Sequence, residues 1–200
     1  MVTATYEYED KAKERGYHYI TGVDEAGRGP GAGPVVAGAV RIPDRFIPVL
    51  TGKVKDSKKL SSKRREELFD IITNSCDYGI GIIDNKVIDK INILEATKLA
   101  MLNAIEDVRF VDYLLVDGIV MLNTDLPQQQ IIKGDNLSIS IAAASIIAKV
   151  TRDEIMRTLH NIYPIYGWDR NKGYLTKIHI DAIKEYGATE FHRRSFNKVK

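Results

Sequence analysis

Apolar residues recur along the chain with two different spacings, which separate predicted strands from predicted helices. Short apolar or alternating runs predict strands at about residues 19–25, 34–42, 78–83, 113–117 and 128–133. Apolar residues every third or fourth position predict helices that start at Ser61 or Ser62, run from Asn92 to about 107, and span 138–160 and 176–186. Strands alternate with helices after an initial hairpin. This order predicts an α/β fold with a mixed sheet flanked by helices.

The remaining segments predict connections within one domain. Residues 1–17 are charged and suggest a short outer helix, while residues 42–52 and 162–173 are expected to be loops. No internal repeat or low-complexity linker divides the sequence. Two hundred residues suffice for one full core, so we expect a single domain over residues 1–200.

Composition narrows the classes of protein. Hydrophobic content of 44% and charged content of 28% are typical of a soluble protein, and no apolar run is long enough for a bilayer or a signal peptide. We therefore expect a cytoplasmic protein without a membrane partner. The single cysteine excludes an internal disulfide, and four scattered histidines argue against a zinc site.

Basic residues are clustered although the net charge is only +2. Seven of the thirteen residues from Lys53 to Arg65 are basic, and smaller groups lie at 170–177 and 193–200. Such clusters suit phosphate binding on a near-neutral protein. Solvated helix faces would produce the same clusters, and for any one of them this simpler interpretation is the stronger.

Two adjacent acids, Asp24 and Glu25, end the first apolar run and precede a glycine-dense turn with one arginine. Neighbours on a strand point to opposite faces, so both acids reach one site only if the chain bends there. The glycines of residues 27–33 would allow that bend. A tight hairpin with solvated acids is the alternative. No glycine fingerprint for a dinucleotide or a nucleoside triphosphate is present.

Two further acids lie at predicted element ends. Asp117 closes the apolar run 113–116, and Asp135 follows the strand at 128–133. Two carboxylates about 4 Å apart repel by roughly 4 kcal/mol at an effective dielectric of 20, so four convergent acids would need protons or divalent cations. Oxygen ligands favour Mg²⁺ or Mn²⁺, and two such ions can clamp both oxygens of a phosphodiester. Spacing alone does not show that the acids converge.

Eight motifs in order resemble the ribonuclease HII family over about residues 19–199. They are Gly22-Val23-Asp24-Glu25-Ala26-Gly27-Arg28-Gly29-Pro30, Asp56-Ser57-Lys58-Lys59-Leu60, Asn92-Ile93-Leu94-x-Ala96-Thr97, Val116-Asp117-Gly118, Lys133-Gly134-Asp135, the block from Ala143 to Asp153, Lys172-Gly173-Tyr174, and His192-Arg193-x-Ser195-Phe196.

This resemblance implies a ribonuclease H fold and a metal-dependent endoribonuclease. The family cuts RNA in RNA–DNA hybrids, including single ribonucleotides embedded in duplex DNA, and serves ribonucleotide excision repair. The implied catalytic and metal-binding acids are Asp24, Glu25, Asp117 and Asp135, which hold two Mn²⁺ or Mg²⁺ ions and leave 5′-phosphate and 3′-hydroxyl ends. The implied substrate-binding residues are Gly27, Arg28, Gly29 and Tyr174, with Lys58 on backbone phosphates. A monomer with a replication-associated partner protein is expected.

Two other classes stay open. A catalytically silent module that binds RNA–DNA hybrids could share the fold, although four acids would hinder phosphate binding. A metal-dependent phosphatase that acts on small molecules is the third possible class.

The sequence departs from the family pattern at Asn197, where many relatives have proline. The early end of the chain leaves affinity from extra C-terminal helices in doubt. An Asp at 135, with no large domain before residue 19, argues against the ribonuclease HIII group.

Overall fold

The central strand β1 (Ile20–Ala26) carries the first acidic pair and has a neighbour on each side. The computed structural model describes residues 4–54, 60–197 and 199. Its five-stranded sheet has the order β3-β2-β1-β4-β5, so the predicted mixed sheet is confirmed. β1 and β2 form an antiparallel hairpin, β3 extends it, and β4 and β5 add parallel strands on the other side. The other strands are β2 (Val35–Arg41), β3 (Asp77–Ile83), β4 (Tyr113–Asp117) and β5 (Gln128–Ile131).

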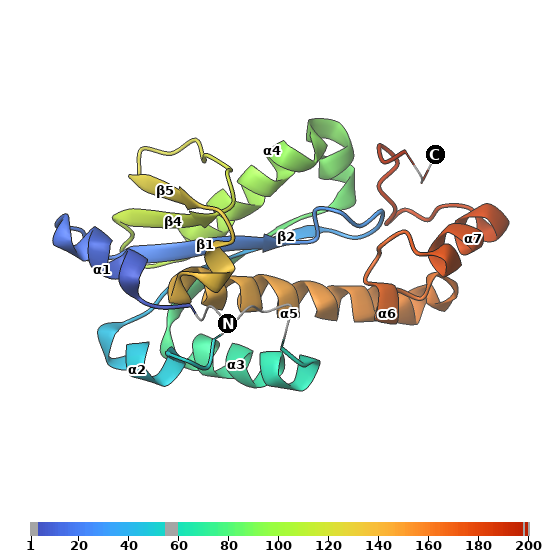
Figure 1. The fold of residues 1–200 in the computed structure, drawn as a ribbon. Coiled ribbons are helices and arrows are strands. Elements are labelled where there is room, and N and C mark those ends of the chain that lie inside the picture. The colour runs from blue at the N-terminus through green and yellow to red at the C-terminus, as the bar shows by residue number, and fades with distance from the viewer. Residues whose placement is uncertain (1–3, 55–59, 198, 200) are drawn as a thin grey trace.

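Helices cover both faces of this sheet (Figure 1). One face packs on α4, and the other packs on α5, against which α3 lies in turn. The described helices are α1 (Glu7–Glu14), α2 (Ile47–Leu50), α3 (Ser62–Ser75), α4 (Asn85–Glu106), α5 (Ile139–Ile162), α6 (Trp168–Asn171) and α7 (Lys177–Tyr186), with short 3₁₀ turns at Asp44–Phe46, Gly134–Asn136 and Pro164–Tyr166.

The helix α5 approaches the sheet closely because two strand positions have no side chain. A Cβ on Gly22 of β1 would lie 2.2 Å from the backbone carbon of Ser140, and a Cβ on Gly38 of β2 would lie 2.4 Å from the carbonyl oxygen of Ala144. Real Cβ atoms do not come so near to backbone. The run of alanines in the first half of α5 therefore packs directly on β1 and β2.

Several predicted element limits differ from the structure. The predicted N-cap at Asn92 interrupts a helix that begins earlier, at Asn85, with Asp84 as its cap. Asn92 has a φ of 67°, and its Oδ1 accepts hydrogen bonds from the backbone N–H groups of Leu94 and Glu95, so it does start the second helical segment. Ser61 is the N-cap of α3, as predicted. The two expected loops contain α2 and α6, each a single turn.

The C-terminal part of the chain gathers at one end of the molecule. Figure 1 shows α6, α7 and the tail beside the turn that joins β1 to β2. Ala32 of that turn shares an apolar cluster with Met156, Tyr166 and Trp168. Residues distant in sequence thus surround the acidic end of β1.

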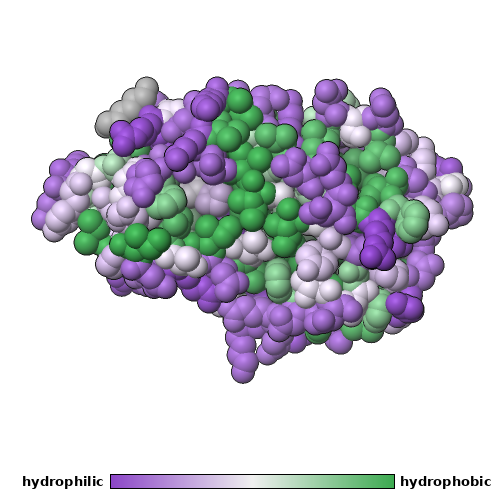
Figure 2. Space-filling model, turned by 180° about the vertical axis from the view of Figure 1, so that it is seen from behind, coloured by the Kyte–Doolittle hydropathy of each residue, from purple (hydrophilic) through white to green (hydrophobic). Residues whose placement is uncertain are grey.

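The surface opposite the view of Figure 1 carries a hydrophobic band between hydrophilic margins (Figure 2). Apolar atoms form more than half of the surface of ordinary folded proteins, so such a band assigns no partner. None of the helices in the described ranges is both long enough and apolar enough to cross a bilayer.

Candidate active site

Asp24 and Asp117 lie side by side where the parallel pairing of β1 with β4 ends. β1 pairs with β4 up to Val23 opposite Val116, and each acid is the next residue on its strand. Asp24 is buried, and its Oδ1 accepts a 2.7 Å hydrogen bond from the backbone N–H of Glu25. The predicted hairpin thus places Asp24 inside the protein, so it is not a solvated tip residue.

Asp135 is brought to the same place by a short 3₁₀ turn after β5. Lys133 adopts a left-handed conformation, with a φ of 59°, and turns the chain back toward β4. The backbone N–H of Gly134 then donates a 2.6 Å hydrogen bond to Asp117 Oδ1. Asp135 follows directly and is buried, and its Oδ1 accepts a hydrogen bond from the side chain of Asn136.

The carboxylates repel one another in their ionised forms. Burial raises the pKa of Asp24 well above its usual range, and the charges of Glu25 and Asp117 raise it further, while a hydrogen bond with Ser145 opposes the shift. Burial also raises the pKa of Glu25, against the attraction of Arg28, and the charge of Asp117 adds to the rise. A bound cation would relieve this repulsion.

The donor atoms near Asp24 fit a hard divalent ion. They are carboxylate oxygens, with no histidine or cysteine among the candidate ligands, which suits Mg²⁺ or Mn²⁺. Within the described ranges no three acidic, histidine or cysteine side chains are already arranged to hold an ion. The hydrogen bonds to Asp117 and Asp135 and the 3.3 Å ion pair between Glu25 and Arg28 occupy carboxylate oxygens in this arrangement.

The glycine turn after β1 is held from inside by the buried guanidinium of Arg193. It donates hydrogen bonds to the carbonyl oxygens of Gly27 at 2.6 Å and Arg28 at 2.9 Å, and also to Gly33 and Pro34. Gly27 has a φ of 97°, which side chains disfavour. The turn is therefore fixed by its backbone.

A second buried arginine, Arg152 of α5, binds the same turn. It donates to the carbonyl oxygens of Ala32, Pro34 and Lys172. Burial lowers the pKa of Arg152 to about 10, and burial together with Arg152 lowers that of Arg193 to about 9, so both are charged at neutral pH. Two positive charges under the turn favour an anion above it.

Tyr174 faces the glycine turn across a hollow of about 310 Å³. Residues 25–29, Ser145, Lys149, Arg152 and Tyr174 line this hollow. The Tyr174 ring is half exposed, and a Cβ on Gly29 would lie 3.3 Å from ring atom Cε1. The structure thus brings Glu25, Gly27, Arg28, Gly29 and Tyr174 around one space.

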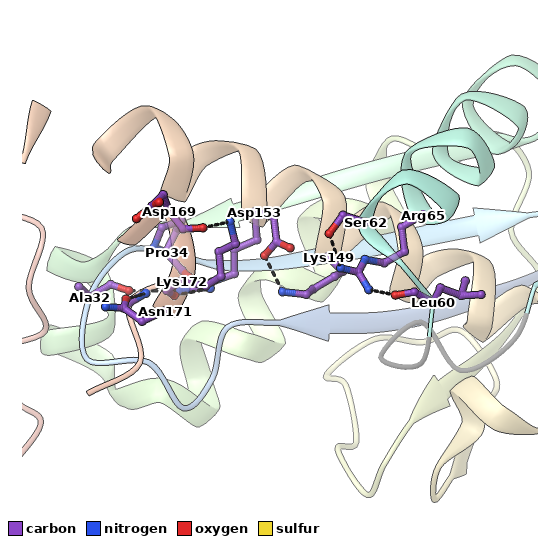
Figure 3. A network of polar contacts seen from close by, with 12 residues as sticks. Ala32, Pro34, Leu60, Ser62, Arg65, Lys149, Asp153, Asp169, Asn171 and Lys172 are labelled. Atoms are coloured by element: carbon purple, nitrogen blue, oxygen red, sulfur yellow. Dashed lines mark hydrogen bonds and ion pairs between the residues drawn. The ribbon is translucent and has the colours of Figure 1, made fainter. Parts of the chain in front are cut away.

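Basic side chains continue from this hollow along α5 and α3 (Figure 3). Lys149 forms a 2.5 Å ion pair with Asp153, Lys172 donates to the Asp169 carbonyl, and Arg65 donates to the Leu60 carbonyl. Lys58, the predicted phosphate-binding lysine, lies outside the described residues.

Sequence reasoning assigned no function to the buried Arg152 and Ser145. It counted Arg193 in a basic group suited to phosphate binding, and this was wrong for Arg193, because its side chain is buried and binds the carbonyl oxygens of Gly27 and Arg28. One signal was available for Arg152. It lies seven residues after Ser145 and four after Ala148, on the stripe of α5 that faces the sheet. A charged residue on a buried stripe indicates a specific partner. Arg193 lies in an irregular tail, where periodicity carries no such signal.

The fold and this acidic strand-end site define a class, the ribonuclease H-like proteins. Ribonuclease H2 from Pyrococcus horikoshii superposes with a TM-score of 0.78 at 29% identity, covering 91% of this chain and 95% of that one. Ribonuclease HII from Archaeoglobus fulgidus, solved as a complex with PCNA, gives 0.73 at 27% identity, covering 90% and 95%. Bst ribonuclease HIII, solved with Mn²⁺, shares the fold with a TM-score of 0.73 at 20% identity, covering 94% and 70%.

Sequence comparison gives the family. The family model described as Ribonuclease HII matches residues 21–199. Ribonuclease HII from Acetivibrio thermocellus is 54% identical over 194 residues, which cover 96% of this chain and 74% of that protein. The Caldicellulosiruptor saccharolyticus enzyme is 52% identical over 195 residues, covering 96% and 94%. The chain belongs to the ribonuclease HII family, and it is a metal-dependent endoribonuclease that acts on RNA–DNA hybrids.

Proposed function

We propose that this enzyme also cuts DNA duplexes at single embedded ribonucleotides, on the 5′ side of the ribonucleotide, and leaves 5′-phosphate and 3′-hydroxyl ends. The observation that carries the proposal is the hollow beside Glu25, because the glycine turn and Tyr174 line it together. The enzyme would then recognise one ribose next to the acids that take part in cutting the phosphodiester on its 5′ side.

Recognition of one ribonucleotide requires a contact with its 2′-hydroxyl, the group that DNA lacks. Backbone groups of Gly27, Arg28 and Gly29 would meet this hydroxyl, since glycine allows a close approach. The Tyr174 ring would pack on the sugar, and its hydroxyl would hydrogen-bond to the 2′-oxygen. The Arg28 guanidinium would hold a neighbouring phosphate. Lys58 would bind a more distant phosphate, which positions the duplex without reading its sequence.

Asp24, Glu25, Asp117 and Asp135 would hold two divalent ions. Burial, followed by repulsion from neighbouring carboxylates, raises the pKa of Asp24 and Glu25, and this supports the role. When bound, such ions supply an activated water and stabilise the leaving 3′-oxygen. Mn²⁺, present in the solved Bst ribonuclease HIII, is a suitable ion. The two buried arginines would hold the turn still while the substrate binds.

The protein would work as a monomer on nucleic acid and meet a replication-associated protein. The Archaeoglobus fulgidus relative, solved with PCNA, supports a partner of this kind. The silent binding module is the rival function, and it predicts salt-dependent duplex binding without cleavage.

The first test uses a labelled DNA duplex with one ribonucleotide, incubated with Mn²⁺ or Mg²⁺. We expect one cut 5′ to the ribonucleotide, none in an all-DNA duplex, and none with EDTA. Asp24→Asn and Asp117→Asn should each lower kcat by about 10³-fold, the effect of losing several kcal/mol of charge stabilisation, and leave the circular dichroism spectrum unchanged. Cleavage of long hybrids alone would refute the proposal. Normal kcat in both variants would refute the metal-ligand assignment.

A further inference from the structure

Two histidines that lie apart in the sequence meet in the interior beside Tyr174. His179 lies in the first turn of α7 and His192 in the C-terminal tail, and their Nε2 atoms are 3.0 Å apart. Both side chains are buried, with 0% and 1% of their surface exposed. Neither of them belongs to the proposed metal site.

The surrounding hydrogen bonds determine which ring nitrogens carry protons. His179 Nδ1 is 2.9 Å from the Tyr174 carbonyl oxygen, which only accepts, so Nδ1 carries the hydrogen. His179 Nε2 then accepts from Trp168 Nε1 at 3.1 Å. His192 Nδ1 accepts from the backbone N–H of Thr189 at 2.9 Å, so its Nε2 carries the hydrogen and donates to His179. In this neutral arrangement Trp168 and His192 share the single lone pair of His179 Nε2.

This pair connects the two sides of the hollow. On one side, His179 donates to the carbonyl of Tyr174. On the other side, His192 is followed by Arg193, whose guanidinium binds the carbonyls of Gly27 and Arg28. The bond between the imidazoles therefore joins the segment that carries Tyr174 to the segment that holds the glycine turn.

The neighbouring groups keep the pair neutral. The Tyr166 ring packs edge-on against both imidazoles. Two charged residues lie in the same tail. Arg194 follows Arg193, and Glu190 binds the hydroxyl of Tyr163, whose ring contacts Trp168. Burial lowers the pKa of His179. Burial, His179 and Arg194 lower the pKa of His192 to about 4. At neutral pH the Nε2 of His179 is therefore an acceptor.

We propose that His179 and His192 are positioning residues that set the place of Tyr174 relative to the glycine turn, and so tune recognition of the ribose. This inference rests on the proposed function, in which those two elements contact the 2′-hydroxyl. His179 acts through the Tyr174 carbonyl, and His192 acts through His179.

A double-mutant cycle between His179 and Tyr174 tests the inference on the single-ribonucleotide duplex. His179→Phe removes the donor and keeps a ring, and we expect kcat/KM to fall about 10- to 100-fold, as for a small misplacement of a binding group. In a Tyr174→Ala background the same change should lower kcat/KM less than about 3-fold, because the positioned residue is gone. His18→Phe, at an exposed position before β1, is the matched control.

A conservative variant separates positioning from general stability. His179→Asn places an amide N–H near the Nδ1 position, so it should retain kcat/KM within about 3-fold of wild type even if the melting temperature falls. An equal loss for His179→Phe in both backgrounds would show a structural role alone and overturn the inference.

A nitrogen-15 spectrum of the histidines gives a readout without catalysis. We expect the hydrogen on Nδ1 of His179 and on Nε2 of His192. The opposite assignment would overturn the inference whatever the activity. If the wild type does not cut the duplex, the proposed function fails. The spectrum, together with the same cycle measured on duplex binding, would still decide the role of the pair.

Discussion

Gly27 and Gly29 lie two residues apart in one turn, yet they are constrained by different contacts. Gly27 has a φ of 97°, and a Cβ there would lie 2.0 Å from Nε of the buried Arg152. The nearest atom to a Cβ on Gly29 is Cε1 of Tyr174 at 3.3 Å, the edge of a half-exposed ring. Both glycines border the hollow, but only the first is required by the fold.

This difference predicts opposite results for two alanine substitutions. Gly27→Ala should lower the free energy of unfolding by about 2 kcal/mol or more, because it adds backbone strain and displaces Arg152. Gly29→Ala should change it by less than about 0.5 kcal/mol but reduce cleavage at a single ribonucleotide, because its methyl group narrows the gap to Tyr174. Urea denaturation and duplex cleavage measure both effects. Equal stability of the two variants would contradict this account.

At the residue scale, the sequence indicated candidate ligands but not the side chains that hold the site in place. The candidate acids could be named because carboxylates after apolar runs mark strand ends. The bonds from Arg152 and Arg193 to backbone carbonyls could not be predicted, since every residue type offers a carbonyl. The contact between His179 and His192 depends on how the tail returns to α7, which no local pattern determines.

At the scale of elements, α1 supports the start of α5 through one buried acid. Glu9 Oε1 accepts hydrogen bonds from the Ser138 hydroxyl at 2.6 Å and from the backbone N–H of Ser140 at 3.0 Å. Glu9 Oε2 has no hydrogen-bond partner among the described residues. Burial raises the pKa of Glu9 despite these bonds.

The raised pKa predicts how stability depends on pH. The folded state binds the Glu9 proton more tightly than the unfolded state does, so this contribution is full below the unfolded pKa of about 4.3 and is lost as pH rises through the folded pKa. Glu9→Gln keeps an acceptor oxygen without the charge. We expect it to raise the free energy of unfolding at pH 8 by on the order of 1 kcal/mol, with little effect at pH 4.

Denaturation series at several pH values measure the effect of Glu9→Gln. Glu14→Gln on the same helix is the control, because Glu14 is exposed. A constant difference between Glu9→Gln and wild type across the pH range would show that the carboxyl does not titrate as proposed.

The strands were easier to predict than the helix limits. All five predicted strands form, and most of their residues are buried in β1, β2 and β4, whereas β5 carries three half-buried glutamines before the buried Ile131. The start of α4 was missed because Asn92 is a good cap in the middle of a longer helix, and Asp84 caps the earlier segment equally well. Single helical turns such as α6 are too short to show a period.

At the scale of the whole molecule, ion binding should stabilise the fold. Ions that bind only the folded state at about 100 times their Kd contribute about 2.7 kcal/mol, which is roughly 5–10 °C in melting temperature for a chain of this size. We expect Mn²⁺ to raise the melting temperature relative to EDTA. The double variant Asp24→Asn with Asp117→Asn should lose most of this rise, and exposed Asp125→Asn should keep it. An equal rise in all three proteins would place the ions elsewhere.

The close contact between Gly22 and α5 affects how near the start of this helix lies to the site. Gly22 lies two residues before Asp24 on the same strand, and the backbone it meets, at Ser140, lies five residues after Asp135. Because position 22 has no side chain, the start of α5, which follows Asp135 in the chain, lies close to the strand that carries Asp24. A single methyl group at position 22 would push the start of α5 away from β1. The preceding turn with Asp135 would then move relative to Asp24, although no candidate ligand is changed.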